Sequence, residues 1–205
     1  MKQELQTNFS DGSNIFFTSD THFSHPHIMK YCNRPWDDVN KMNEDLIKNW
    51  NSVVSKDSVV FHLGDFAWGK NWSPILNQLN GRKILILGNH DMRNMDKDAI
   101  KNCFEHVSQQ LYIKIEHRRV MLNHCPFLCY SGTYRENEDK VYQLFGHVHS
   151  GPYSDKSLDN ERLLKLFPTQ YDVGVDNNNF TPVSWKEVNT KIQNQILNNK
   201  NEYEE

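Results

Sequence analysis

Long apolar runs are absent from this sequence of 205 residues, and their absence sets the first limits on its function. No stretch approaches the roughly eighteen consecutive apolar residues that a membrane-spanning helix needs. Hydrophobic residues make up 37% of the chain and the mean hydropathy is −0.77, as expected for a polar globular protein with no membrane partner. The first residues, 1–6, lack the apolar core of a signal peptide, so we expect a cytoplasmic protein.

Paired cysteines and concentrated positive charge are also missing. The four cysteines (Cys32, Cys103, Cys125 and Cys129) form no CxxC pair, so we expect free thiols in a reducing compartment. The formal net charge is −3 without a basic tract, which argues against binding a long nucleic acid. Repeats, low-complexity blocks and linkers are absent too. We therefore predict a single domain over residues 1–205, with its core at about 14–197 and a polar tail at 198–205.

The first half of the sequence alternates between predicted strands and helices. Short apolar runs predict strands at 14–19, 58–63 and 83–87. Between them, apolar residues at three- and four-residue spacing predict a helix at 37–53, and Pro74 opens a shorter helix. This strand-helix alternation predicts parallel strands and an α/β fold.

The second half predicts more strands and fewer helices. The expected elements are a helix at 96–104, a hairpin at 111–116 and 120–123, strands at 141–145, 162–166 and 171–175, and a last helix. Ser184 and Glu187 have the spacing of a capping box, which predicts that this last helix begins there.

Polar side chains follow the ends of five predicted strands. They are Asp20 and His22, Asp65, Asn89 with His90, His124, and His147 with His149. Each of these residues alone is explained equally well as a turn residue that caps backbone groups. To explain all five strand ends in this way would require five independent coincidences. Oxygen and nitrogen donors without thiolates suit Mn²⁺, Fe²⁺ or Zn²⁺. Because the donors are too many for one ion, the pattern favours two ions that share a carboxylate such as Asp65.

These residues also form a set of ordered motifs. They are D-x-H at 20–22, G-D at 64–65, G-N-H-D at 88–91, a histidine at 124 and G-H-x-H at 146–149. Over about residues 14–185 the set resembles the calcineurin-like metallophosphoesterase family. The segment N-E-x-L-I-x-N-W at 43–50 is similar to that of small stand-alone members common in bacteria and their phages. If a phage encodes the protein, we expect it in the host cytoplasm. The resemblance implies an α/β fold, a four-layer α/β/β/α sandwich with a dinuclear metal site at one edge.

The resemblance also implies a role for each motif residue. The first ion would take Asp20, His22, Asp65 and His149, and the second would take Asp65, Asn89, His124 and His147. His90 would face the phosphate and the leaving group as a catalytic residue. Asp91 would either orient His90 or cap the following turn. Mn²⁺ is the favoured metal, with Fe, Zn or Ni as alternatives.

The implied activity is hydrolysis of a small or nucleotide-derived phosphodiester by attack of metal-bound hydroxide. Cyclic nucleotides are among the candidate substrates. Alternatives are a phosphomonoesterase, a nuclease, or a catalytically silent binding module on the same fold. A protein phosphatase of this family is expected to carry G-D-x-V-D-R-G, whereas this chain reads G-D-F-A-W-G at 64–69. The oligomeric state stays open.

Several further side chains are candidates for substrate contacts. Asn89, His25 and Arg93 are the preferred ones. Arg34, Arg82 and His27 are weaker candidates, because an arginine more often serves a structural ion pair or a solvated surface. Trp36, Trp68, Trp72 and Tyr130 are candidates for stacking on a base, although such aromatics more often belong to the core.

Overall fold

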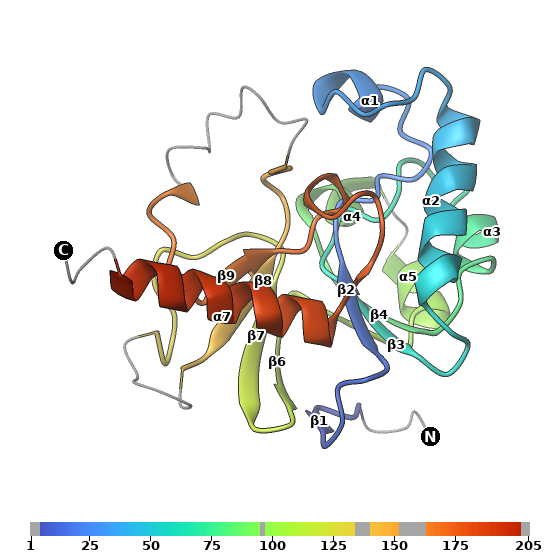
Figure 1. Cartoon of the computed structure of the whole chain (residues 1–205). Helices are drawn as coiled ribbons and strands as arrows, with labels where there is room; N and C mark the ends of the chain where they lie inside the picture. The colour runs from blue at the N-terminus through green and yellow to red at the C-terminus, as the bar shows by residue number, and fades with distance from the viewer. Residues whose placement is uncertain (1–4, 95–96, 134–139, 152–162, 202–205) are drawn as a thin grey trace.

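A computed structural model describes residues 5–94, 97–133, 140–151 and 163–201 of the chain. Within these residues, ten strands form two five-stranded sheets that pack face to face (Figure 1). The first sheet has the order β10-β2-β3-β4-β5 and the second has the order β1-β6-β7-β8-β9.

The first sheet is built on the predicted strand-helix alternation. Its strands are β2 (Ile15–Thr18), β3 (Val59–His62), β4 (Arg82–Ile86), β5 (His106–Ser108) and β10 (Val183–Ser184). Strands β2 to β5 run parallel and β10 is antiparallel to β2. Alternate side chains of each strand enter different clusters, so Phe61 packs between the sheets while Val60 packs against the helices.

Helices cover the outer face of this first sheet. The helices after its strands are α2 (Val39–Val53), α3 (Ser73–Leu76), α4 (Asn89–Asn94) and α5 (Lys97–Cys103). In α2, Asp38 accepts a hydrogen bond from the backbone N–H of Lys41 as the N-cap, and Met42, Leu46 and Trp50 are buried. Helices α2, α3 and α5 lie on one side of the sheet (Figure 1), where they enclose a second hydrophobic cluster. A short helix, α1 (Ile28–Tyr31), precedes them.

The second sheet faces the first across the main hydrophobic core. Its strands are β1 (Asn8–Phe9), β6 (Gln110–Ile115), β7 (Arg118–Asn123), β8 (Tyr142–Phe145) and β9 (Gln170–Asp172). Strands β6 and β7 form the predicted antiparallel hairpin, and β7, β8 and β9 run parallel. A 3-10 turn, η2 (Val175–Asn177), follows β9.

The last helix, α7 (Trp185–Asn201), packs along the edge of the two sheets. Ser184 and Glu187 make the predicted capping box, with reciprocal hydrogen bonds between side chains and backbone. Trp185, Val188 and Ile192 enter the core between the sheets. The predicted α/β fold on two sheets is confirmed.

Three expectations need correction. The predicted strand at 162–166 is wrong over its described part, because Leu163–Leu166 form a turn closed by an N–H to C=O bond and Leu164 is 88% exposed. Helix α7 continues through residue 201, so the expected tail is helical in its first part, and 202–205 lie outside the described residues. The short strands β1, β5 and β10 have no counterpart in the prediction, since two or three residues are too few to show a period.

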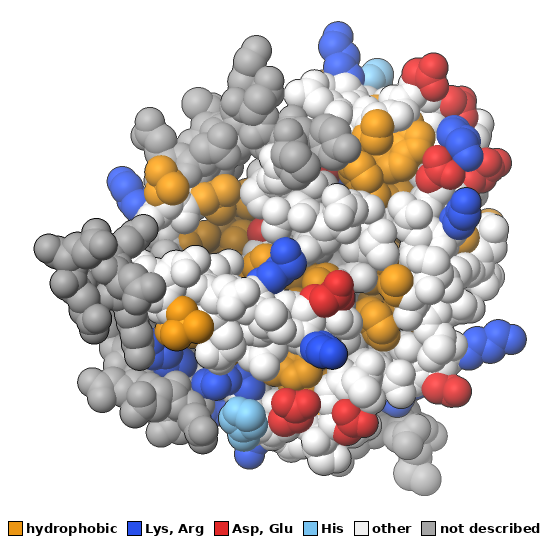
Figure 2. Space-filling view, in the orientation of Figure 1, with side chains coloured by type: hydrophobic (Ala, Val, Ile, Leu, Met, Phe, Trp, Pro, Cys, Tyr) orange, Lys and Arg blue, Asp and Glu red, His pale blue; other side chains and the backbone are white. Residues whose placement is uncertain are grey.

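No helix in the described part of the chain is long and apolar enough to cross a membrane. On the face shown in Figure 2, basic and acidic side chains are interspersed.

Candidate metal centre

The carboxyl ends of both sheets meet at one edge of the molecule. Strands β2, β3 and β4 are parallel, as are β7, β8 and β9, so each group delivers its following residues in one direction. A bridge between Ser19 and Gly174 joins the two groups there. The motif residues, which are spread over 130 positions of sequence, therefore converge on one place.

Three motif glycines allow this convergence. A Cβ added to Gly88 would lie 2.2 Å from Oδ1 of Asp65, and one added to Gly146 would lie 2.3 Å from Oδ2 of Asp20. Gly64 has φ +97° and packs against the backbone of Gly88. Each glycine is required because the backbone must approach a carboxylate or another backbone segment more closely than a side chain permits.

Strained backbone marks the same positions. Five of the motif residues have positive φ angles, which is unusual outside glycine: Asp20 (56°), His22 (47°), Asp65 (56°), His147 (73°) and His149 (48°). Such strain concentrates at functional sites, where the surrounding structure stabilises it. The loops are therefore shaped to aim these side chains inward.

Asp20, His22 and His149 form the first half-site. Their candidate ligand atoms all lie within 4.8 Å of one another, and Nε2 of His149 is 3.8 Å from Oδ1 of Asp20. Oδ1 of Asp20 and both ring nitrogens of His22 are buried without a hydrogen-bond partner. Burial, with the nearby His149, holds the pKa of His22 well below its usual range, so the ring is neutral and one of its nitrogens has a lone pair for a cation. These orphaned atoms fit a divalent metal ion.

A chain of buried ionic contacts supports the first half-site. Oδ2 of Asp176 accepts from Nδ1 of His149 at 2.8 Å, which directs Nε2 of that ring toward Asp20. Arg34 donates to both oxygens of Asp176, at 2.8 and 2.9 Å, and to the carbonyls of Asp20 and Thr21. Burial alone would raise the pKa of Asp176, but the charge of Arg34 and the bonded His149 lower it to about 2.

Asn89, His124 and His147 form the second half-site, and Asp65 lies between the two. Oδ2 of Asp65 is 3.6 Å from Nε2 of His22 on one side and 3.5 Å from Nε2 of His124 on the other. Nε2 of His124 is also 3.1 Å from Oδ1 of Asn89 and 3.2 Å from Nδ1 of His147. One carboxylate oxygen thus faces both half-sites, as a bridging ligand must.

The buried carboxylates of Asp20 and Asp65 stabilise positive charge near them. Burial alone would lower the pKa of His124, but its contact with Asp65 and the charges of Asp20 and Asp65 raise it to about 9. Nδ1 of His124 donates to the carbonyl of Leu63 at 2.7 Å, so Nε2 is the nitrogen that faces the carboxylates. The site therefore attracts cations at this point.

Asp91 holds the loops rather than the ring of His90. Its carboxylate accepts from the backbone N–H groups of Gly88, Asp65 and Phe66 at 2.8 to 2.9 Å. It thereby joins the loops after β3 and β4 and fixes Asp65. These contacts match neither role that the sequence left open, because they involve neither the ring of His90 nor the turn after Asp91.

His90 lies at the open side of the cluster, with its side chain 32% exposed. Its backbone N–H donates to Oδ1 of Asp65 at 2.8 Å. Its ring centre is 5.2 Å from that of His22, 5.6 Å from that of Trp68 and 6.4 Å from that of His25. His90 thus stands between the candidate ligands and an aromatic wall.

The structure gives the preferred candidate Arg93 and most of the weaker substrate-contact candidates other surroundings. Arg34 is committed to Asp176, and Arg82 pairs with Glu105 at the start of β4, so neither is available to a phosphate. Arg93 is exposed in the last turn of α4, and His27 is exposed beside Tyr31. Trp72 packs in the core against Phe104, whereas Trp36 and Tyr130 make structural contacts. Trp68 remains near the cluster.

Sequence reasoning missed Asp176, and it favoured a structural or surface role for Arg34 without naming a partner. They are 142 residues apart, and no local spacing connects them. The available signal was that Asp176 directly follows the predicted strand at 171–175, as Asp20 directly follows the strand at 14–19.

Comparison with known proteins agrees with this site. The family model for calcineurin-like phosphoesterases matches residues 13–176. The chain therefore belongs to the calcineurin-like phosphoesterase family, as its motifs indicated. This membership makes it a metal-dependent phosphoesterase by class, and the ligand groups described above are of the kind that such an enzyme needs.

Individual relatives carry little functional information. An uncharacterized protein of Methanocaldococcus jannaschii is 49% identical over 81 residues, and this match spans 38% of the chain but only 46% of that protein. The Gene 66 protein of Mycobacterium phage L5 is 36% identical over 163 residues, covering 67% of this chain and 78% of that protein. A solved Aquifex aeolicus protein of unknown function shares the fold, with a TM-score of 0.63, 24% identity, and coverage of 86% of this chain and 97% of its own.

Proposed function

We propose that this protein is a phosphodiesterase that uses two divalent metal ions to hydrolyse a small or nucleotide-derived phosphodiester. The observation that carries the proposal is the position of His90, between the candidate ligand His22 and a wall formed by the exposed Trp68 and the buried His25. A phosphate held at the ligands would place one ester group beside His90 and its organic substituent against the aromatic wall.

The two half-sites would hold one ion each, with Asp65 shared and Mn²⁺ the favoured metal. When bound, a pair of divalent ions activates water and neutralises phosphate charge. Asn89 contributes a neutral oxygen, so the site keeps a positive surplus for an anionic substrate. Asp20 and Asp65, both buried, balance part of the metal charge.

His90 would protonate the leaving alkoxide or stabilise a non-bridging phosphate oxygen. His25 would assist at the same wall. Its Nδ1 accepts from the backbone N–H groups of His27 and Ile28, so its Nε2 carries the proton and can donate to a substrate oxygen. Trp68, 40% exposed and 4.2 Å from the ring of His25, offers a face for stacking.

The arginines favour a diester over a monoester. A phosphomonoester dianion is commonly held by arginine forks. Here Arg34 and Arg82 are both engaged by carboxylates, and the substrate wall of the described residues is imidazole and indole. A singly charged diester with an organic group on each side suits that wall better.

Three alternatives remain distinct from this proposal. A phosphomonoesterase would prefer a dianionic substrate, and a nuclease would cleave long DNA or RNA. A catalytically silent binding module would have the fold but no turnover. We also propose that the protein acts in the cytoplasm, or in the host cytoplasm if a phage encodes it.

The test compares Mn²⁺-dependent hydrolysis of bis-p-nitrophenyl phosphate with that of p-nitrophenyl phosphate. We expect faster turnover of the diester, its loss in Asn89→Ala, and a decrease of about 10²- to 10⁴-fold in His90→Ala. His117→Ala is the matched control, because this histidine is exposed in the β6–β7 turn. Faster monoester turnover would favour the phosphomonoesterase, and metal binding without turnover of either substrate would favour the binding module.

A further inference from the structure

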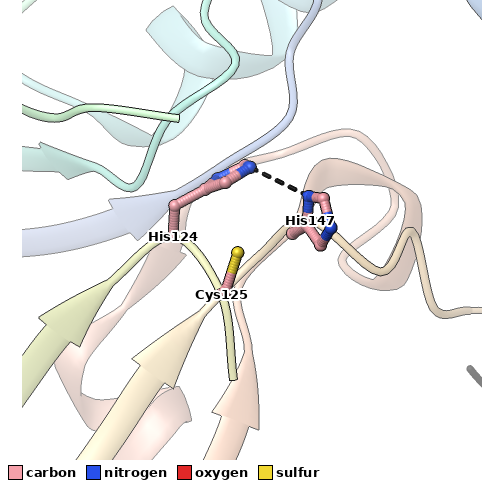
Figure 3. A group of neighbouring side chains, drawn as sticks. All are labelled: His124, Cys125 and His147. Atoms are coloured by element: carbon pink, nitrogen blue, oxygen red, sulfur yellow. Dashed lines mark hydrogen bonds between the residues drawn. The ribbon is translucent and has the colours of Figure 1, made fainter. Parts of the chain in front are cut away.

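One cysteine lies at the second half-site. The Sγ atom of Cys125 and one ring nitrogen each of His124 and His147 all lie within 4.8 Å of one another. Figure 3 shows the thiol pointing toward the two imidazole rings, which approach from the ends of β7 and β8. Cys125 is half-buried, unlike Cys103 and Cys129, which are exposed.

The backbone around Cys125 is clamped, so the direction of its Cα–Cβ bond is set by the fold. The amide of Gln143, fully buried on β8, donates to the carbonyl of Cys125 at 3.1 Å and accepts from the N–H of Phe127 at 3.0 Å. The N–H of Cys125 donates to Oδ1 of Asn123 at 3.0 Å. Both faces of the peptide at residue 125 are therefore held, and Pro126 restricts it further.

The two imidazoles face the same point as the thiol. Nε2 of His124 and Nδ1 of His147 are 3.2 Å apart, drawn as the dashed line in Figure 3. Nδ1 of His124 is occupied by the carbonyl of Leu63, which leaves Nε2 directed toward the half-site. Two imidazole nitrogens and one sulfur at this separation are the ligand types that bind Zn²⁺, whereas Mn²⁺ and Mg²⁺ prefer oxygen.

We propose that Cys125 is a metal ligand of this chain, and that with His124 and His147 it gives the second half-site a preference for thiophilic divalent ions such as Zn²⁺, Co²⁺ and Cd²⁺. On binding, the S–H proton is released to solvent and the thiolate forms the bond to the metal. The first half-site offers a carboxylate and two imidazoles, so the two ions of the centre differ in chemistry. This inference rests on the proposal that the centre holds metal ions, and it is independent of the substrate.

The test is a Co²⁺ titration of the full-length, chelator-treated protein followed by absorption spectroscopy. A thiolate ligand produces a sulfur-to-cobalt charge-transfer band in the near ultraviolet, which imidazole and carboxylate ligands do not. We expect this band in the unmodified protein and its loss in Cys125→Ser. The same variant should lose Zn²⁺ affinity by about 10- to 100-fold.

Three other cysteines provide matched controls. Cys103→Ser and Cys129→Ser alter exposed thiols and should keep the band. Cys32→Ser is the more demanding control, because Cys32 lies within 4.8 Å of ligand atoms of His149 and Asp176 beside the first half-site. A band that disappears in Cys32→Ser but persists in Cys125→Ser overturns the assignment, as does Co²⁺ binding without a band. Failure to bind any divalent metal overturns the proposed function as well.

Discussion

The two half-sites of the metal centre use similar ligands but are supported differently. In the first, His149 is oriented by Asp176, which is itself held by both arms of the buried Arg34. In the second, the ring of His124 is oriented by a single backbone carbonyl, that of Leu63, and a thiol lies beside it. The first half-site is fixed by hydrogen bonds between oppositely charged groups, which are stronger than a bond to an uncharged carbonyl such as that of Leu63.

This difference assigns the half-sites different tasks. An ionic network that includes the backbone carbonyls of Asp20 and Thr21 makes the first half-site part of the folded framework. The second half-site has no such ionic network in the described residues, and the Cys125 thiol lies beside its two histidines. If support and metal binding are divided in this way, substitutions at the two half-sites should differ in their effects on stability and on metal affinity.

Removal of Arg34 should cost the most stability. In Arg34→Ala the carboxylate of Asp176 stays buried without its partner, and breaking a buried ion pair in this way costs about 3–5 kcal/mol. Urea unfolding of the metal-free protein measures the loss. Arg82→Ala removes the same kind of pair from an exposed position and should cost about 1 kcal/mol or less. Equal losses in the two variants would contradict the framework role of Arg34.

Substitution of Asp65 should affect both half-sites at once. Its Oδ2 faces His22 and His124 at nearly equal distances, so Asp65→Asn removes the charge that both ions would share. We expect turnover to fall by about 10²- to 10³-fold, together with weaker binding of both ions in a calorimetric Mn²⁺ titration. If only one ion were affected, Asp65 would not be a shared ligand.

The sequence predicted much of this centre because its motifs are local. Each motif follows a strand end, so strand prediction and motif recognition place Asp20, Asp65, Asn89, His124 and His149 at the same sheet edge. The prediction is strongest where a strand is long enough to show its apolar run, as in β3 and β4.

What the sequence did not predict depends on contacts between distant residues. Arg34 looks like any loop arginine until the fold brings Asp176 to it. The segment 162–166 has the apolar residues of a strand, but the sequence does not show that Leu164 is exposed. The position of the Cys125 thiol was not predicted for a similar reason, because this cysteine forms no CxxC pair and lies beside His124 and His147, which follow different strands.

Substitution of Asp176 should weaken the first ion selectively. Asp176→Asn keeps the shape but removes the charge that orients His149, and loss of such a partner costs about 10- to 100-fold in metal affinity. A Mn²⁺ titration followed by electron paramagnetic resonance measures this, since a single bound Mn²⁺ and a coupled pair have different spectra. Glu105→Gln, which alters the exposed arginine pair, is the control. An unchanged coupled-pair signal in Asp176→Asn would mean that the first half-site binds its ion without support from Asp176, which would contradict the difference between the two half-sites.

The smallest effect serves as the reference for all the others. Ser184→Ala removes the capping box of α7, remote from both half-sites, and should lower the free energy of unfolding by about 1 kcal/mol. The hydrogen bonds from Ser184 lower the pKa of Glu187 below its usual 4.5, so their stabilisation is present above that pH and is lost as the pH falls through the lowered value. The difference in stability between the two proteins should therefore shrink in acid, which unfolding at pH 7 and near pH 3 would measure.

Mn²⁺ affinity of Ser184→Ala at pH 7 should stay unchanged, because no ligand or ligand-orienting group is touched. If this variant also lost metal affinity, general stability rather than the Arg34–Asp176 chain would control the first half-site, and the contrast between the two halves would fail.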